Sequence, residues 1–574
     1  MRKGNDDYDD MSIYKAMFPC SRRGRRCLAG FGHARSNLPR RKYIIMRISS
    51  NCILTMACVL SLCAGCGSDS GGSISSKAAK GESAYAISGK VVSDRGTPVA
   101  QVVLTLSGDH SGTTTTDADG NYRFADLSNG DYIVSPSLAG YLFSPADLSV
   151  TLRGADGSGI DFVATATTAG LNMWTWVSGD SIINQAGAYG ILGLAAGTNT
   201  PGARVDSAGW ADSRDQLWLF GGFGYVGALP GYLNDLWKFD GTNWTWVSGD
   251  SQADQPGVYG VQGVAGDANK PGARAGSIGW VDDQDHLWLF GGYGYDGTAP
   301  GYLNDLWTFD GKTWTWVSGD SRADQPGAYG TPKVAAKSNV PGGRCNSVSW
   351  KDSRGNLWLF GGWGYDGSGA FGCLNDLWKF DGAVWTWISG DSSADQAGVY
   401  GTKGMAAGSN KPGARIGSVS WTDSRDNLWL FGGAGYDGAG AVGNLNDLWK
   451  FDGATWTWVS GDSSADQAGV YGTKGMAAGS NKPGARVGGM GWTDSLGNLW
   501  LFGGEGSTGT QASVFLNDLW RFDGAAWTWI SGERTSDQAG VYGVRGTAAD
   551  SNNPGARYDG IGWTDSKDTL WLFG

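Results

Sequence analysis

A tryptophan motif that returns every 70 or 71 residues constrains this chain more than any other feature. The triplet Trp-Thr-Trp begins at six positions: Trp174, Trp244, Trp314, Trp385, Trp456 and Trp527. Each unit also contains Pro-Gly-Ala/Gly-Arg and Leu-Trp-Leu-Phe, and most contain Leu-Asn-Asp-Leu-Trp-x-Phe-Asp-Gly. Self-similarity at a fixed period indicates a repeat architecture, in which each unit buries its apolar surface against the next.

The composition of the chain favours an all-β protein. It holds 97 glycines and 30 tryptophans but only 16 prolines in 574 residues. This balance fits many short strands joined by tight turns, with large aromatic side chains packed between sheets. Because the tryptophans return at the same places in every unit, we expect them to pack between units; a stacked platform for sugars is the alternative.

Residues 172–574 resemble the kelch repeat, because each unit has four expected strands, a Gly-Gly pair and paired aromatic residues. The resemblance implies a β-propeller in which Pro-Gly-Ala-Arg opens the inner strand and Trp-Thr-Trp forms the outermost. Leu-Trp-Leu-Phe and Asp-Leu-Trp-x-Phe would be the second and third strands. The chain would then close its ring by overlap, since the first unit starts with an outer strand and the last stops at Gly574 after two strands. We predict six blades, the last lacking its third strand; a seventh blade in a longer protein stays open.

A small β-sandwich is predicted for residues 84–166, where about seven short alternating strands are separated by turn residues. The run Thr-Asp-Ala-Asp-Gly-Asn-Tyr-Arg-Phe (116–124) resembles the carboxypeptidase regulatory-like, transthyretin-related domain. That resemblance implies a rigid spacer without catalysis. Asp117 and Asp119 suit a hairpin turn, with a calcium site as the alternative.

The segment 46–65 has the three parts of an export signal: a basic start, a short apolar run and small residues before a cysteine. Ala64-Gly65-Cys66 resembles the lipobox of bacterial lipoproteins, which implies acylation of Cys66; simple secretion is the alternative. Residues 66–83 would be a flexible tether, and residues 1–45 a misannotated upstream segment. By analogy, the glycine after Cys66 favours the outer membrane, with the protein on the surface or in the periplasm.

Charge is divided unevenly along the chain. Residues 1–45 carry 11 Lys/Arg and 4 Asp/Glu, whereas the whole chain has a net charge of −11. The body is therefore acidic, which argues against nucleic acid as a partner. A lipid anchor would be its only contact with a membrane.

The sequence places one loop-rich end on the propeller. Short turns are expected at 212–215 and 240–243, and long connections at 178–203 between blades and 221–233 within one. Function on a rigid scaffold concentrates in long loops. Recurrent carboxylates and tyrosines there are the candidate binding residues, either as a rim for glycan or calcium or as pins that join one blade to the next. They are Asp250, Asp254, Tyr259, Asp320, Asp324, Tyr329, Asp391, Asp395, Tyr400, Asp462, Asp466 and Tyr471.

An arginine in each inner strand would lie near the channel mouth, where it would bind an anion or, as we expect, pair with the aspartate of Leu-Asn-Asp-Leu-Trp.

Export favours an oxidising compartment, so a disulfide between Cys345 and Cys373 is predicted.

No catalytic or metal-binding motif stands out. Kelch propellers include galactose oxidase, whose copper site needs two histidines, and this propeller has only His286. No cofactor is expected, with calcium as the single open alternative. We therefore expect a binding or scaffold protein that presents its loop-rich end to a protein or glycan. A carbohydrate-active enzyme using carboxylates near the channel and a purely architectural envelope protein are the alternatives.

Overall fold

The computed structural model describes residues 45–48, 84–93, 96–138, 141–166, 173–507 and 513–574. Every regular element in these ranges is a β-strand, which confirms the all-β prediction. With no helix in them, they hold none long and apolar enough to cross a membrane. Most of the expected export signal, Cys66 and the tether lie outside the described residues.

Residues 84–166 form the predicted sandwich of two four-stranded sheets. One sheet has the order β5-β2-β9-β7, made of β5 (Asn121–Leu127), β2 (Tyr85–Ser93), β9 (Phe162–Ala166) and β7 (Tyr141–Ser144). The other has the order β4-β3-β6-β8, made of β4 (Gly112–Thr115), β3 (Val103–Gly108), β6 (Gly130–Ser137) and β8 (Leu148–Leu152). Asp117 Oδ1 accepts the backbone N–H groups of Asp119 and Asn121, 3.0 and 2.8 Å away, as expected for a hairpin turn.

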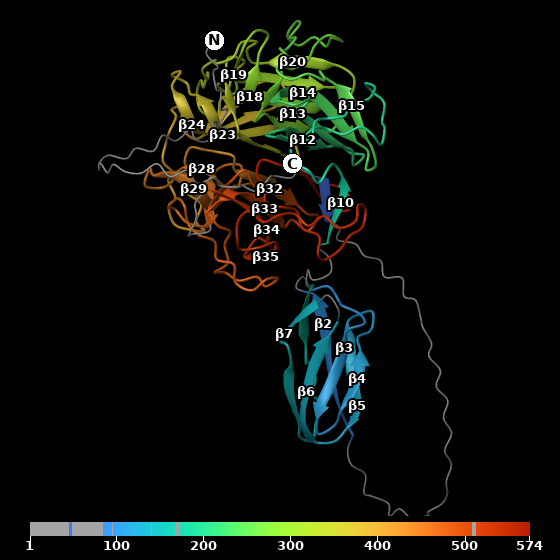
Figure 1. The fold of residues 1–574 in the computed structure, drawn as a ribbon. Helices are drawn as coiled ribbons and strands as arrows, with labels where there is room; N and C mark the ends of the chain where they lie inside the picture. The colour runs from blue at the N-terminus through green and yellow to red at the C-terminus, as the bar shows by residue number, and fades with distance from the viewer. Residues whose placement is uncertain (1–44, 49–83, 94–95, 139–140, 167–172, 508–512) are drawn as a thin grey trace, which may run out of the picture. The chain divides into compact units, whose positions relative to one another are not determined.

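Six further sheets follow one another around a ring (Figure 1). Five of them are coloured from green to red in chain order, and the sixth also contains a blue and a teal strand. Blade 1 contains β11 (Arg204–Val205), β12 (Ala208–Ala211), β13 (Leu217–Tyr225), β14 (Pro230–Phe239) and β15 (Trp244–Ser248). Blade 2 contains β16 (Arg274–Ala275), β17 (Ile278–Val281), β18 (Leu287–Tyr295), β19 (Pro300–Phe309) and β20 (Trp314–Ser318). Blade 3 contains β21 (Arg344–Cys345), β22 (Val348–Lys351), β23 (Leu357–Tyr365), β24 (Phe371–Phe380) and β25 (Trp385–Ser389).

Blade 4 contains β26 (Arg415–Ile416), β27 (Val419–Thr422), β28 (Leu428–Tyr436), β29 (Val442–Phe451) and β30 (Trp456–Ser460). Blade 5 contains β31 (Arg486–Val487), β32 (Met490–Thr493), β33 (Leu499–Gly506), β34 (Val514–Phe522) and β35 (Trp527–Ser531). In each of these five blades the inner strand is interrupted once, and both of its pieces pair with the second strand. The predicted order from the inner to the outermost strand is confirmed.

Blade 6 takes its strands from distant parts of the chain, in the order β36 (Ile561–Thr564), β37 (Leu570–Phe573), β1 (Ile45–Ile48) and β10 (Trp174–Ser178). The predicted gap at the third strand is therefore wrong for this structure, because Ile45–Ile48 occupies that position. Met46 pairs with Leu572 on one side and with Trp176 on the other. The backbone groups of β37 and β10 would otherwise be unpaired edges, and Ile-Met-Arg-Ile repeats the apolar-apolar-basic-apolar pattern of Leu-Trp-Arg-Phe (519–522).

The tryptophans form the cores between blades, as predicted. Six apolar clusters each combine side chains of two adjacent blades, including the pair formed by blades 6 and 1. Trp307, at 0 % exposure, packs in one cluster with Trp210 of the preceding blade. The indole N–H of Trp210 in turn donates to the carbonyl of Trp288 in blade 2, 3.1 Å away. These side chains therefore hold neighbouring blades of the ring together, which is the packing role expected for them.

Neighbouring strands run antiparallel, so the connections alternate between two ends of each blade. Residues 212–216 and 240–243 are the short turns of one end. The opposite end carries residues 179–203 and 226–229, and we call it the loop-rich end. The connection within the blade is shorter than the predicted 221–233, because strands β13 and β14 continue past the Gly-Gly pair through a local register shift.

Candidate functional site

A buried charge cluster occupies the same place in blades 1 to 5. In blade 2, Arg274 Nη1 lies 2.6 Å from Asp305 Oδ1, and both side chains are 0 % exposed. Trp307 Nε1 and the Tyr259 hydroxyl each donate to Asp305 Oδ2 at 2.7 Å. The other ion pairs are Arg204–Asp235, Arg344–Asp376, Arg415–Asp447 and Arg486–Asp518. The predicted arginine–aspartate pairing is confirmed, and these arginines are committed to the scaffold.

The four tyrosines predicted as binding residues belong to these clusters. Each donates its hydroxyl to the cluster aspartate at 2.6 or 2.7 Å, and burial raises the pKa of each phenol. They are Tyr259, Tyr329, Tyr400 and Tyr471. Each tyrosine therefore binds the loop between two blades to the second of those blades. Of the two roles predicted for these tyrosines, the structure supports the one that joins blades and not the ligand-binding rim.

The first predicted aspartate of each loop also serves the scaffold. Asp250 accepts the Lys270 ammonium at 2.6 Å and the Asn234 amide at 2.8 Å. Asp391 and Asp462 pair in the same way with the lysines of their own loops. Asp320 has valine at the lysine position, and its backbone N–H donates to Asn304 Oδ1 at 3.0 Å.

The second predicted aspartate is different, because it is exposed at the loop-rich end. Asp254 has a φ of +60° and accepts the backbone N–H of Tyr232 through Oδ1 at 3.0 Å. Asp324, Asp395, Asp466 and Asp537 accept the N–H of the matching residue in their own blades. None of these five forms an ion pair within the described part of the chain. Two of them have a further partner, because the Tyr365 hydroxyl hydrogen-bonds Asp324 and the Tyr436 hydroxyl hydrogen-bonds Asp395.

In each of blades 1 to 5, one set of residues paired across the first three strands differs from repeat to repeat. It lies next to the buried charge cluster, which is the same in all five blades. In blade 1 this row pairs Val205 with Phe223 and Phe223 with Tyr232 across three strands. The same positions hold Ala275, Tyr293 and Tyr302; Cys345, Trp363 and Cys373; Ile416, Ala434 and Asn444; and Val487, Glu505 and Phe515. We call it the variable row; comparing the repeats position by position would have revealed it from the sequence.

Aromatic side chains of the variable row join across blades 1 to 3. Ring centroids lie 4.6 to 5.5 Å apart along a continuous chain of contacts that also takes in the first residue of β24. The members, in order, are Phe223, Tyr232, Tyr293, Tyr302, Phe371 and Trp363. All six are at least partly exposed. We call this cluster the aromatic arc; sequence analysis did not single it out.

A closed ring of backbone hydrogen bonds runs through the gap in the inner strands. In each blade one residue with φ between +51° and +66° donates its N–H to the matching carbonyl of the preceding blade, at 2.8 to 3.2 Å. The members are Asp206, Gly276, Asn346, Gly417, Gly488 and Asp559. The two aspartates are neighbours where blade 6 meets blade 1. Burial raises the pKa of Asp206 to about 7.

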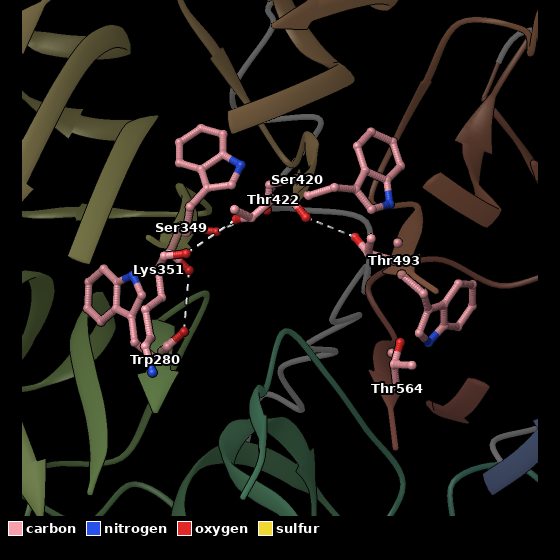
Figure 2. Close-up of a pocket in the computed structure, with 13 residues that line it drawn as sticks. Trp280, Ser349, Lys351, Ser420, Thr422, Thr493 and Thr564 are labelled. Carbon is pink, nitrogen blue, oxygen red and sulfur yellow. Dashed lines mark hydrogen bonds between the residues drawn. The ribbon is translucent and has the colours of Figure 1, made fainter. Parts of the chain in front are cut away.

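The central channel widens into a cavity of about 400 Å³ on the side of the short turns. Figure 2 shows the hydroxyl groups of Ser349, Ser420, Thr422 and Thr493 joined to carbonyls of neighbouring blades, at 3.2 to 3.5 Å. Lys351, which also lines the cavity, pairs with Asp283 at 2.5 Å. These groups link the inner strands to one another.

The predicted disulfide is wrong, because Cys345 and Cys373 are free and buried. Both residues are cross-strand partners of Trp363, one on each side of its strand. Since adjacent strands lie about 4.8 Å apart, the two Cα atoms are separated by roughly 10 Å, beyond the ~7 Å that a disulfide spans. Burial raises the pKa of both thiols.

No metal-binding arrangement emerges from the described residues. They contain no group of three or more His, Cys, Asp or Glu side chains placed to hold an ion. His286 contacts Asp282, with Nδ1 3.0 Å from Oδ2. The exposed aspartates of the loop-rich end lie one in each of five blades, so they do not come together as ligands for a calcium ion.

Comparison with known proteins agrees with this architecture. A family model described as KLHDC2/KLHL20/DRC7 Kelch-repeats domain matches residues 193–337. This stretch is similar to kelch repeats. A second model, described as carboxypeptidase regulatory-like domain, matches residues 86–165. Both matches agree with the resemblances found in the sequence, and the structure has the β-propeller and the β-sandwich that those resemblances imply.

No curated protein matches the chain. Among solved structures, one titled "Structure of YjhT" is 13% identical, with a TM-score of 0.38, and the match covers 66% of this chain and 90% of that one. We draw nothing about function from that likeness. The kelch-type fold suggests a protein-binding or scaffold role, but fold alone does not determine function, so the site must be argued from its own residues.

Proposed function

We propose that this chain is an exported bacterial binding protein that recognises a protein or glycan through the loop-rich end of its propeller. The observation that carries the proposal is the variable row. Repeats that otherwise keep the same charge clusters, tryptophans and turns differ there, and three adjacent blades gather partly exposed aromatic residues. Exposed aromatic clusters on a rigid scaffold mark interaction surfaces.

Export is the second part of the proposal. The pattern of residues 46–65 and the Ala-Gly-Cys sequence ending at Cys66 support processing and acylation, and so an outer-membrane lipoprotein on the surface or in the periplasm. Cleavage before Cys66 would also remove Ile45–Ile48, so the processed protein would lack strand β1 of blade 6. Metabolic labelling of expressing bacteria with an alkyne fatty acid tests this directly. The wild type should take up label and fractionate with membranes, and Cys66→Ser should do neither. Unlabelled, unprocessed wild type would reject this part.

Binding is tested by thermal shift of the full chain against glycans and candidate proteins. A ligand at a hundredfold excess over its dissociation constant stabilises the folded state by about 2.7 kcal/mol. The shift should be lost in Trp363→Leu, which shortens the aromatic arc without touching a charge cluster. A ligand whose shift survives this substitution binds elsewhere, and the proposed site would then be wrong.

A carbohydrate-active enzyme remains the second candidate, favoured by one observation. Burial raises the pKa of Asp206 to about 7, beside Asp559 in the backbone ring, and a carboxyl group with such a pKa can donate a proton near neutral pH. Chromogenic glycosides offer the test. Turnover that is abolished in Asp206→Asn would establish the activity; turnover by neither protein removes this candidate.

A further inference from the structure

The chemistry around the aromatic arc narrows the kind of ligand it suits. The backbone N–H groups of Tyr232 and Tyr302 are held by Asp254 and Asp324, at 3.0 and 2.9 Å. Both aspartates are exposed, and neither forms an ion pair with any described residue. The arc therefore has two exposed carboxylates without a cationic partner attached to its central tyrosines; Asp324 also accepts a hydrogen bond from the Tyr365 hydroxyl.

The tyrosines themselves stay uncharged. Burial raises the pKa of Tyr232 and Tyr302, and neighbouring groups, Tyr293 among them, add to the effect. Neutral phenol rings keep the negative ring faces that attract cations. The negative charge of this surface thus comes from the aspartates, while the rings supply apolar area and ring faces.

The geometry of the rings favours a cation over a stacked sugar. Successive rings of the arc meet at interplanar angles of 55° to 83°, so no two neighbours form one flat platform. Successive sugar units need such flat faces, whereas a cation is attracted to a ring face at any orientation of its neighbour. An arginine or lysine can also form an ion pair with the exposed aspartate carboxylate at the edge of the same ring.

We propose that the aromatic arc, with Asp254 and Asp324, binds a partner protein through a segment carrying arginine or lysine. The inference rests on the proposed function and names the partner chemistry of the same site. The cationic side chain lies over a tyrosine or tryptophan face, and its charge is met by one of the two aspartates. Aliphatic stems of the basic side chains cover the apolar ring edges.

The test uses the full chain and a fluorescent twelve-residue Gly/Ser peptide that carries three arginines. A second peptide carries citrulline in place of arginine, which keeps the shape and removes the charge. Fluorescence anisotropy at 50 mM salt should give at least tenfold tighter binding of the arginine peptide. Equal binding of both peptides, or no binding of the arginine peptide, overturns the inference.

The variants place the binding on the arc. Asp324→Asn should weaken binding of the arginine peptide about fivefold to tenfold, because asparagine keeps the hydrogen bond to Tyr302 and removes the charge. The matched control Asp537→Asn makes the same change in blade 5, outside the arc, and should alter binding by less than twofold. Equal effects of the two variants would show a diffuse charge effect and overturn the inference.

Failure of the inference can be told apart from failure of the proposed function. If a neutral glycan binds, loses affinity in Tyr302→Leu and is indifferent to Asp324→Asn, the site stands and its partner chemistry is wrong. If neither the peptides nor a glycan panel responds to Tyr302→Leu, while its melting temperature shows a folded protein, both are wrong.

Discussion

Replacing Asp206 by asparagine should stabilise the protein at alkaline pH and leave it unchanged in acid. Asp206 is the ring residue whose N–H donates to the Asp559 carbonyl at 3.2 Å, the longest bond of the ring. Asparagine suits the left-handed backbone, since Asn346 occupies the equivalent place in blade 3 with a φ of +53°. The substitution therefore removes a charge and little else.

The sign follows from linkage. Burial raises the pKa of Asp206 to about 7, whereas an unfolded aspartate titrates near 3.9. The folded protein consequently holds a proton that the unfolded chain has released between about pH 4 and pH 7, so stability falls as pH rises through this range. A difference of about three pH units corresponds to at most about 4 kcal/mol. Since the side chain is only half-buried, we expect about 2 kcal/mol.

Thermal unfolding at a series of pH values measures this effect. For a propeller of about 400 residues, 2 kcal/mol corresponds to a rise in melting temperature of roughly 2–3 °C. Asp206→Asn should melt higher than wild type by that amount at pH 8, and the difference should vanish near pH 4. Asn346→Asp, which adds a carboxylate to the same ring, is the matched reverse change and should lower the melting temperature at pH 8. An Asp206→Asn effect that is equal at both pH values would refute the reasoning.

Three further predictions follow from other parts of the molecule. Asp376→Asn should destabilise the protein by about 3–5 kcal/mol, because Arg344 is left charged and buried without its carboxylate; denaturant unfolding measures this, and a loss below 1 kcal/mol would contradict it. Both Cys345 and Cys373 should be alkylated in unfolded protein without reductant, as read by mass spectrometry, whereas an unmodified pair would restore the disulfide. Deletion of residues 1–48 from the unprocessed full-length protein should lower its melting temperature by several degrees, because β1 is lost from between β37 and β10; an unchanged melting temperature would show that β1 adds nothing to blade 6.

The fold was open to sequence reasoning because its signals are repeated. Six copies of Trp-Thr-Trp and a fixed period determine the number of blades, and the invariant arginine and aspartate point to a buried ion pair. What failed depended on register. Cys345 and Cys373 share one blade, but only the pairing of each with Trp363 places a full strand between them. No spacing in the sequence shows that Ile45–Ile48 pairs with β37.

Only part of the candidate site was predicted from the sequence, because the sequence does not show which polar residues of a loop are buried. Asp254 and Tyr259 lie in the same loop and looked equivalent as members of a rim. The structure separates them, because Tyr259 is buried on Asp305 while Asp254 reaches the surface beside Tyr232. A recurrent polar residue can be a scaffold contact or a surface group, and burial alone distinguishes the two.

Variation among the repeats is informative because the charge clusters cannot vary. Loss of any one member would leave a buried charge or a buried hydroxyl without its partner, at a cost of several kcal/mol. Blades 1 to 5 therefore all keep the same arginine and aspartate. The variable row lies one residue away and leaves no such partner behind, so it is free to change. Free change by itself would scatter polar residues over an exposed end. Instead Phe223, Tyr293 and Trp363 fill the same position in three consecutive blades, and their rings belong to one connected surface. A connected run of aromatic residues in three of the blades suits a single asymmetric ligand, and six-fold packing does not require it.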